Sequence, residues 1–270
     1  MVIRAGVVGH PVAHSLSPRI HNGWFAELGI EGRYEAVDAA PGAFAATIRR
    51  LAAEGWSGVN VTVPHKPAAY DLADETTRGA QRVGAANLLL FRDGRIIGDN
   101  TDGVGFAHAL PALPDRDPLR SVVLGAGGAA APVAAELVRH GLVSIVNRTA
   151  ARAEDLARRL GPGLTAASWD ELPAILAHTD VLVNTTSLGM TGQPPLDIDL
   201  SPMPPGGVVV DIVYAPVKTD LLAQAAARGL KPAGGLSMLV HQAAPSFEAF
   251  AGQPPRDPGH TLRMLEAERG

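Results

Sequence analysis

A glycine-rich turn between a predicted buried strand and a predicted helix limits the folds open to this chain most strongly. Residues 122–130 read Val-Val-Leu-Gly-Ala-Gly-Gly-Ala-Ala, which fits the pattern G-x-G-x-x-G/A. Gly125 permits a tight turn, Gly127 lets the backbone approach a pyrophosphate, and Ala130 allows the helix to pack closely on the strand. The helix N-terminus would present free N–H groups and a positive dipole end to phosphate. The segment predicts a dinucleotide-binding βαβ unit, with a glycine turn used only for packing as the alternative.

The residues that follow the next predicted strand indicate which dinucleotide binds. Asn147, Arg148 and Thr149 stand where NAD-dependent enzymes usually carry an acidic residue that bonds the ribose 2′-hydroxyl. Neutral and basic side chains there favour a 2′-phosphate, and Arg152 adds a second cation one helical turn further on. Each hydrogen bond to a charged group contributes about 1.5–3 kcal/mol. NADP is therefore the predicted cofactor, and surface arginines beside a solvated helix cap are the alternative.

Short apolar runs rich in β-branched residues alternate with alanine-rich helical stretches, which predicts βα units and mostly parallel sheets. Strands are expected at residues 2–9, 34–37, 58–63, 88–91, 95–98, 121–124, 143–146, 181–184, 208–213 and near 230–233. Helices are expected at residues 18–28, 41–54, 129–140, 152–160, 237–250 and 259–267. Arg92-Asp93-Gly94 is predicted to form a hairpin turn, and residues 114–118 a loop before the second series of strands.

Composition excludes several classes of partner and site. With 270 residues, 46% of them hydrophobic, the chain can bury a core and form one large domain or two modest ones. The net charge is −4 without a basic tract, so nucleic acid is not an expected partner. There is no cysteine, and His10, His14 and His21 do not share one helical face, so no metal site is expected. Without a signal peptide or a membrane-spanning apolar run, we expect a soluble cytoplasmic monomer or homodimer.

Seven separated segments carry a family resemblance. They are Gly-His-Pro-Val-Ala-His-Ser-Leu-Ser-Pro at 9–18, Asn-Val-Thr-Val-Pro-His-Lys at 60–66, Gly-Ala-Ala-Asn at 84–87, Gly-Asp-Asn-Thr-Asp-Gly at 98–103, Asn-Thr-Thr-Ser-Leu-Gly-Met at 184–190, Asp-Ile-Val-Tyr-Ala-Pro at 211–216 and Gly-Leu-Ser-Met-Leu-Val-His-Gln-Ala at 235–243. In order and spacing they resemble the shikimate dehydrogenase family, from near the first residue to beyond residue 250.

The resemblance implies an α/β fold of two domains with a cleft between them. Residues 1–101 plus 238–270 would form a discontinuous substrate-binding catalytic domain, and residues 102–237 a Rossmann-type NADP-binding domain. The implied activity is NADP-dependent, reversible reduction of 3-dehydroshikimate to shikimate in aromatic amino acid biosynthesis.

The resemblance also implies roles for individual residues. Lys66 and Asp102 are expected to be the catalytic pair. The expected substrate ligands are Ser15, Ser17, Asn60, Thr62, Asn87, Tyr214 and Gln242. The expected cofactor-binding residues are Gly125, Ala126, Gly127, Gly128, Ala129, Asn147, Arg148, Thr149, Arg152, Thr185, Ser187, Ile212 and Gly235.

The side-chain chemistry agrees with these roles. Hydroxyl and amide side chains supply both donors and acceptors for a polyhydroxylated cyclic acid. Reduction of a ketone needs a hydride, which the nicotinamide supplies, and a proton for the developing alkoxide. The ammonium group of Lys66 can stabilise that oxyanion or donate the proton, and Asp102 can orient Lys66 or bond the neighbouring hydroxyl.

Each of these residues also has a structural reading. Ser17 before Pro18 is typical of a helix N-cap, and Asp102 is well placed to cap a helix that starts near Gly103. Lys66 taken alone reads as a surface lysine, and Gln242 as an exposed residue on an alanine-rich helix. The agreement of the seven segments favours the functional roles.

The sequence departs from the family pattern at three places. Ala131-Pro132 stands where the glycine-rich loop often continues into an Arg, which removes one expected cofactor contact. Asp220 stands where a Pro is common. Pro245 lies inside a predicted helix and is expected to kink or restart it, because proline lacks an N–H and clashes one turn back, which would shift Gln242.

Three other functions stay open. A related dehydrogenase acting on quinate or an amino-substituted analogue would use the same pocket with small changes near Ser15, Ser17 and Thr62. A non-enzymatic NADP-binding regulator has no need of Lys66 and Asp102 as a proton relay. A methyltransferase would usually place an acid where Arg148 stands.

Overall fold

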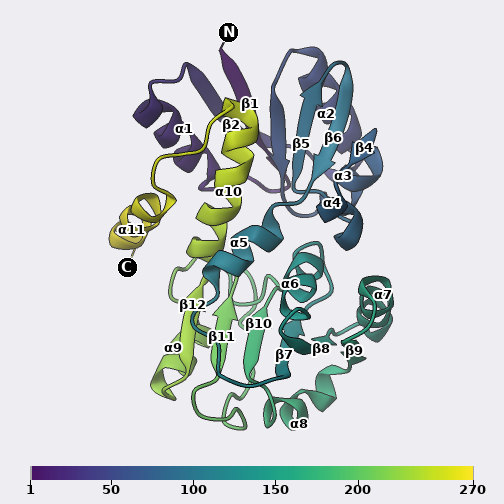
Figure 1. The fold of residues 1–270 in the computed structure, drawn as a ribbon, viewed down its shortest axis with the longest axis vertical. Coiled ribbons are helices and arrows are strands. Elements are labelled where there is room, and N and C mark those ends of the chain that lie inside the picture. Colours follow the sequence, from purple (N-terminus) through teal and green to yellow (C-terminus); the bar gives the residue numbers. More distant parts are fainter. Residues whose placement is uncertain (1, 270) are drawn as a thin grey trace. The chain divides into compact units, whose positions relative to one another are not determined.

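The structure, a computed structural model, describes residues 2–269 and divides into two compact units (Figure 1). Unit 1 contains the residues up to Gly105 together with Leu239–Thr261, and unit 2 contains Phe106–Met238 together with the residues from Leu262 onward. Each unit is built on its own six-stranded sheet. The predicted α/β class with two mostly parallel sheets is confirmed.

Unit 1 places its strands in the order β2-β1-β3-β5-β6-β4. These strands are β1 (Ile3–Gly9), β2 (Gly32–Asp38), β3 (Gly58–Val61), β4 (Glu75–Thr76), β5 (Leu88–Arg92) and β6 (Arg95–Asp99). Only β5 runs antiparallel to its neighbours β3 and β6, and the other pairs are parallel. The ends of β1, β3 and β6 and the start of β5 therefore lie at the same edge of the sheet.

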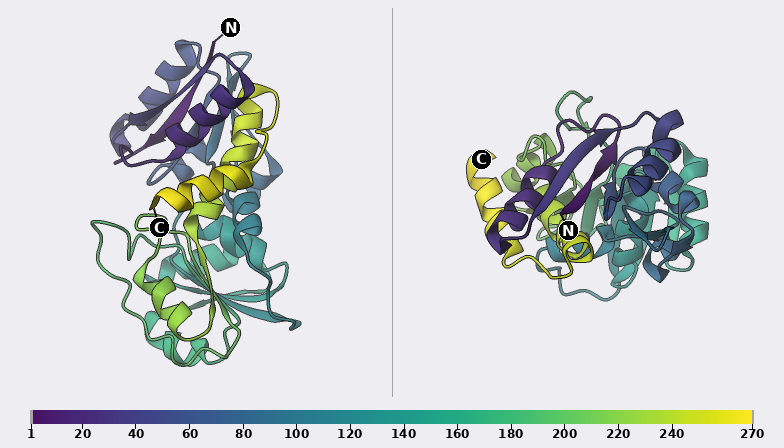
Figure 2. Two further views of the ribbon diagram at one scale, coloured as in Figure 1. Left: turned by 90° about the vertical axis from the view of Figure 1, so that its left-hand side faces the viewer. Right: turned by 90° about the horizontal axis from the view of Figure 1, so that it is seen from above.

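Helices cover both faces of this sheet. They are α1 (Ser17–Leu28), α2 (Phe44–Ala53) after the 3₁₀ turn η1 (Pro41–Ala43), α3 (Lys66–Leu72), α4 (Arg78–Val83), and parts of α5 (Asp102–Ala109) and α10 (Gly235–Ala251). Figure 2 shows α2 on one face of the sheet and α1 with α10 on the other. Phe44, Ile48 and Leu51 of α2 are buried against the strands, and Phe25 of α1 contacts the ring of Phe247 of α10.

The hairpin between β5 and β6 follows from its turn residues. Asp93 and Gly94 both have positive φ, at 51° and 72°. A two-residue turn of this kind matches the twist of antiparallel strands and favours Asp-Gly. The hairpin predicted from the sequence is confirmed, with Arg92 paired to Arg95 across it.

Unit 2 is an entirely parallel sheet in the order β12-β11-β10-β7-β8-β9. Its strands are β7 (Leu119–Leu124), β8 (Gly141–Val146), β9 (Leu164–Ala167), β10 (Val181–Asn184), β11 (Val208–Asp211) and β12 (Lys231–Gly234). Its helices are α6 (Ala130–Leu137), α7 (Ala150–Leu160), α8 (Leu172–Leu176) after the 3₁₀ turn η2 (Trp169–Glu171), and α9 (Asp220–Ala227), and α11 (Pro258–Arg269) begins in unit 1 and ends here. The order reverses at β7, and ligands of such sheets bind outside the strand ends at that point.

Several local predictions differ from the structure. Leu16, not Ser17, occupies the N-cap of α1. The Ser17 side chain bonds Tyr34 rather than the first turn of the helix. The helix α10 runs without interruption through Pro245, so the predicted restart is wrong. No residue ranges were predicted for the short strands β4 and β9 or for the helices α3, α4, α8 and α9. No helix of residues 2–269 has the length and apolar character needed to cross a bilayer.

An aromatic cluster around His21 joins α1, β2 and α10. The ring of His21 is fully buried and stacks on Tyr34 with centroids 4.0 Å apart. Trp24, Phe247 and Phe250 surround it. Within residues 2–269, neither ring nitrogen has a hydrogen-bond partner. Burial lowers the pKa of His21 to about 3, so the imidazole is neutral in the folded protein at neutral pH.

We expect His21 to make the protein sensitive to acid. Below its unfolded pKa of about 6.5, the unfolded chain binds a proton that the folded chain does not accept, so stability falls as the pH drops from about 6.5 toward 3. The expected slope is about 1.4 kcal/mol per pH unit within that window. His21→Leu should flatten the pH dependence of the free energy of unfolding, measured by urea titration from pH 7 to pH 4.5. The exposed His178→Gln is the control, and an unchanged slope in His21→Leu would contradict the expectation.

Candidate active site

Polar side chains gather at the edge of the unit 1 sheet where β1, β3 and β6 end and β5 begins. The loop after β1 carries Ser15 and leads into Ser17, β3 is followed by Thr62 and Lys66, Asn87 directly precedes β5, and Asp102 follows β6. The antiparallel direction of β5 brings Asn87 to this edge. The topology therefore collects residues from four separate sequence segments.

Lys66 and Asp102 form an ion pair at the centre of this group. Lys66 Nζ donates to Asp102 Oδ2 at 2.6 Å, and the two side chains are 12% and 5% exposed. Lys66 is the first residue of α3 and Asp102 the first of α5. The ammonium group has three donors and this bond uses one of them. Lys66 can therefore donate two further hydrogen bonds to a bound molecule.

Asn87 links this ion pair to the next layer of side chains. Its Nδ2 lies 2.9 Å from Asp102 Oδ1, 2.9 Å from Thr101 Oγ1 and 3.2 Å from Gln242 Oε1. Its Oδ1 accepts the backbone N–H of Thr101 at 2.8 Å. Two N–H groups face three acceptors, so the amide has a choice of partners within a buried site.

Asn60 is held by three protein groups. Tyr34 donates its hydroxyl to Asn60 Oδ1 at 2.8 Å, and Asn60 Nδ2 donates to Ser246 Oγ at 2.8 Å and to the Asn87 carbonyl at 3.2 Å. Burial raises the pKa of Tyr34 well above its usual value, and a hydrogen bond with Ser17 lowers it by less. Both N–H groups of Asn60 are therefore used, and only Oδ1 can take a further partner, as an acceptor.

The remaining predicted substrate residues of unit 1 lie beside these groups. Ser17 is buried and bonds with Tyr34, while Ser15 accepts the backbone N–H of Ser17. Thr62 lies against Gly9, where an added Cβ would come within 2.4 Å of Thr62 Cγ2. Only glycine at position 9 leaves this space for Thr62.

Tyr214, the last of the predicted substrate residues, belongs to unit 2, in the segment after β11.

The turn after β7 in unit 2 has the geometry of a phosphate cradle. Gly125 has φ +104°, and an added Cβ would come within 3.0 Å of Thr185 Oγ1, so glycine fits here. At Gly127 an added Cβ would meet nothing within 4 Å, which leaves the loop open to solvent. Ala126, Gly128 and Ala129 complete the turn and α6 follows. Such a turn can hold a pyrophosphate on backbone N–H groups.

Two guanidinium groups stand at the start of α7. Arg148 and Arg152 are exposed, and neither guanidinium group has a hydrogen bond or ion pair with any residue from 2 to 269. Thr149 is the N-cap of α7 without a side-chain capping bond, and Asn147 Nδ2 donates to the Thr149 carbonyl at 2.9 Å. These unpaired cations at a helix N-terminus are able to bind a phosphate monoester.

A buried aspartate fixes the loops that carry the other predicted cofactor residues. Asp211 accepts from Asn184 Nδ2 at 2.9 Å, from the Val213 N–H at 3.1 Å and from Thr219 Oγ1 at 2.7 Å. Burial raises the pKa of Asp211, against the smaller effect of these hydrogen bonds. Asp211 thus ties the end of β10, which precedes Thr185, to the end of β11.

The other predicted cofactor residues occupy this same edge of unit 2. Thr185 Oγ1 donates to the Leu124 carbonyl at 2.6 Å, which fixes the strand before Gly125. Ser187 is exposed two residues later. An added Cβ at Gly235 would come within 2.1 Å of the Ile212 carbonyl, so only glycine allows this approach.

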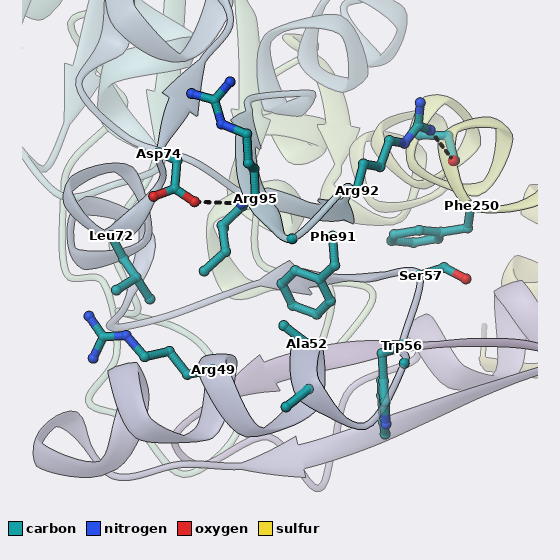
Figure 3. Close-up of a pocket in the computed structure, with 15 residues that line it drawn as sticks. Arg49, Ala52, Trp56, Ser57, Leu72, Asp74, Phe91, Arg92, Arg95 and Phe250 are labelled. Carbon is teal, nitrogen blue, oxygen red and sulfur yellow. Dashed lines mark hydrogen bonds between the residues drawn. The ribbon is translucent and has the colours of Figure 1, made fainter.

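A separate depression of about 830 Å³ in unit 1 contains none of these residues (Figure 3). Trp56, Phe91 and Phe250 line it together with three arginines, which are Arg49, Arg92 and Arg95. Figure 3 shows that the three guanidinium groups point in different directions, and Arg92 is bonded to the Ala249 carbonyl at 2.9 Å. These cations do not converge on one anion position.

Six residues of these networks were not predicted as site residues. They are Tyr34, Thr101, Asn184, Asp211, Thr219 and Ser246. Thr101 and Asp211 stand inside the recognised segments, next to predicted site residues, and this adjacency was the available signal. Ser246 lies one helical turn after Gln242. For Tyr34 the sequence offers no signal, because its partner Asn60 comes from another strand.

Two family models match this chain. The family model of the shikimate dehydrogenase substrate binding domain matches residues 7–89, and the model of shikimate / quinate 5-dehydrogenase matches residues 109–190. Shikimate dehydrogenase (NADP(+)) of Methylobacterium radiotolerans is 55% identical over 262 residues, covering 94% of this chain and 93% of the relative. That of Methylocella silvestris is 51% identical over 98% of this chain and 96% of the relative.

A solved structure matches both units. Shikimate 5-dehydrogenase from Thermus thermophilus, in complex with NADP(H) and shikimate, has a TM-score of 0.87 and 39% identity. The match covers 98% of this chain and 99% of that chain. The resemblance predicted from the seven segments is confirmed. The cytoplasmic location and the monomeric or homodimeric state stay predictions.

Proposed function

The chain belongs to the shikimate dehydrogenase family and interconverts 3-dehydroshikimate and shikimate with NADP, and we propose that Lys66 and Asp102 carry out the proton chemistry of this reaction. The reaction is a reversible reduction of a ring ketone in aromatic amino acid biosynthesis. The single observation that carries the assignment is the buried ion pair, joined to an amide cluster at the sheet edge.

Lys66 is the group suited to the carbonyl oxygen. The bound cofactor supplies the hydride, and negative charge then develops on the former carbonyl oxygen. A preorganised ammonium group stabilises an oxyanion strongly in a site from which water is excluded. Of the three N–H groups on Lys66, one is held by Asp102 at 2.6 Å. The other two are available to the substrate oxygen, and one proton passes to it as the alcohol forms.

Both carboxylate oxygens of Asp102 accept a hydrogen bond from a neighbouring side chain. Oδ2 accepts from Lys66 and Oδ1 accepts from Asn87. Both bonds fix the orientation of the carboxylate beside the Lys66 ammonium group. We propose that Asp102 orients Lys66 and accepts a hydrogen bond from the substrate hydroxyl next to the reacting carbon.

Hydroxyl and amide groups of unit 1 supply the substrate contacts in this proposal. Ser15, Ser17 and Thr62 offer hydroxyls that donate or accept, while Asn60 has only an acceptor left. Asn87 and Gln242 can exchange their mutual bond for bonds to the substrate. A site that hydrogen-bonds each hydroxyl rejects analogues that lack it. Tyr214 of unit 2 is proposed as a further substrate contact.

Unit 2 fits NADP through groups that are present in the chain. The turn at Gly125 and Gly127 would hold the pyrophosphate, and Arg148 and Arg152 the 2′-phosphate. We propose residues 102–237 as the NADP-binding domain and residues 1–101 plus 238–270 as the substrate-binding domain. Ile212, Thr185 and Ser187 are proposed to face the nicotinamide half.

The first test is the reaction itself. Reduction of NADP at 340 nm by the purified protein should be rapid with shikimate and much slower with quinate, and slower with NAD than with NADP. A preference for quinate would keep the fold and the ion pair but assign the related dehydrogenase activity. NADP binding without turnover of either acid would support the non-enzymatic regulator.

Removal of the ammonium group should abolish most of the activity. We expect Lys66→Met to lower kcat by about 10²–10⁴-fold, because general acid catalysis contributes on that order. The dissociation constant of NADP, measured by fluorescence titration, should change less than twofold, since Lys66 lies in unit 1. The exposed Lys218→Met is the matched control and should keep normal kcat. A fully active Lys66→Met enzyme would refute the catalytic assignment.

Cofactor choice should depend on the two cations at α7. We expect Arg148→Ala to raise the KM for NADP about ten- to a hundredfold, the equivalent of one lost charge-assisted bond. The KM for NAD should stay within twofold, because NAD has no 2′-phosphate. Arg159→Ala, an exposed arginine in the last turn of the same helix, should change neither constant. An equal loss with both cofactors would show that Arg148 acts on the fold rather than on the 2′-phosphate.

A further inference from the structure

Thr101 lies where the sheet edge that carries Lys66 and Asp102 meets helix α10. It lies between the end of β6 and the start of α5 and is 4% exposed. Its Oγ1 is 2.9 Å from Asn87 Nδ2 and 2.9 Å from the Gln242 carbonyl. A carbonyl only accepts, so the Thr101 hydroxyl donates to Gln242 and accepts from Asn87.

The backbone of Thr101 determines which way the Asn87 amide faces. The Thr101 N–H donates to Asn87 Oδ1 at 2.8 Å. Because an N–H requires an acceptor, the oxygen end of the amide faces Thr101. The nitrogen end is therefore directed at Asp102 Oδ1 and Gln242 Oε1, at 2.9 and 3.2 Å.

The same hydroxyl also anchors the turn of α10 that carries Gln242. The Gln242 carbonyl of this helix receives Thr101 Oγ1 at 2.9 Å and Ser246 Oγ at 3.3 Å. Ser246 is in turn bonded by Asn60 at 2.8 Å. Side-chain hydroxyls thus hold Gln242 beside Asn87 across more than one hundred residues of sequence.

We propose that Thr101 is a positioning residue of the active site, whose hydroxyl holds the side-chain amide of Asn87 and the backbone of Gln242 in place, so that both side chains can meet the substrate. It does not touch the reacting atoms and acts through these two side chains. The proposal rests on the proposed function, since Asn87 and Gln242 are substrate contacts there. The role is distinct from helix capping, because the Thr101 hydroxyl bonds α10 and Asn87.

The test removes the hydroxyl and keeps the shape. Thr101→Val keeps the backbone N–H and the β-branched side chain, and should lower kcat/KM for shikimate about tenfold, mainly through KM. The KM for NADP should stay within twofold. Thr101→Ser restores a hydroxyl and should recover most of the loss. If Thr101→Val does not fold, Thr101→Cys carries the test, because a thiol is only a weak donor and acceptor.

Thr179→Val is the matched control for stability. Thr179 is also buried and donates its hydroxyl to a backbone carbonyl, that of Ile175, at 2.8 Å, but it lies in unit 2. It should lower the Tm by a similar amount and leave the KM for shikimate unchanged. Normal kinetics of Thr101→Val, failure of Thr101→Ser to rescue, or an equal rise of the shikimate KM in Thr179→Val would overturn the proposal. A wild-type protein without shikimate turnover would overturn the proposed function itself, which the variants do not address.

Discussion

The buried ion pair between Lys66 and Asp102 is the interaction on which the organisation of unit 1 depends. Two charged groups that lose most of their hydration need additional hydrogen bonds, because their attraction alone does not repay the cost of desolvation. Asp102 obtains one from Asn87 at 2.9 Å. The Asn87 amide must itself be held in one orientation, and its hydrogen bonds with the Thr101 N–H and with Gln242 Oε1 do this. The polar cluster is thus a consequence of holding two charges where water is scarce.

The sheet topology makes this cluster possible. In an entirely parallel sheet, the residue before a strand lies at the opposite edge from residues that follow the strands. The antiparallel β5 reverses that relation for Asn87, which lies beside Asp102 and close to the end of β3. The Asp93-Gly94 hairpin then returns the chain through β6 to the same edge. One tight turn therefore sets the position of both Asn87 and Asp102.

Features that depend on neighbouring residues could be predicted from the sequence. Contacts between residues far apart in the sequence could not. The Asp93-Gly94 hairpin and the β7–Gly125–α6 turn depend on neighbouring residues, and both are present. The strands β4 and β9 are short and partly exposed, so they carry no run of buried apolar residues. Lys66 and Asp102 were recognised through family segments, since a single lysine after a strand otherwise indicates a solvated surface. Thr101 and Ser246 were not predicted as site residues, because their hydrogen-bond partners come from distant segments of the chain.

The departure at Ala131-Pro132 has a packing reason that bears on cofactor binding. Both residues are buried in α6, as are most residues of that helix, which lies against the unit 2 sheet. A long cationic side chain at these positions would have to leave that packed surface to reach a phosphate. In our proposal, the positive charge that binds the 2′-phosphate therefore comes from the residues after β8. There Arg148 and Arg152 are exposed, and their guanidinium groups make no hydrogen bond or ion pair within residues 2–269. In that proposal, the preference for NADP over NAD depends on one short segment rather than on two.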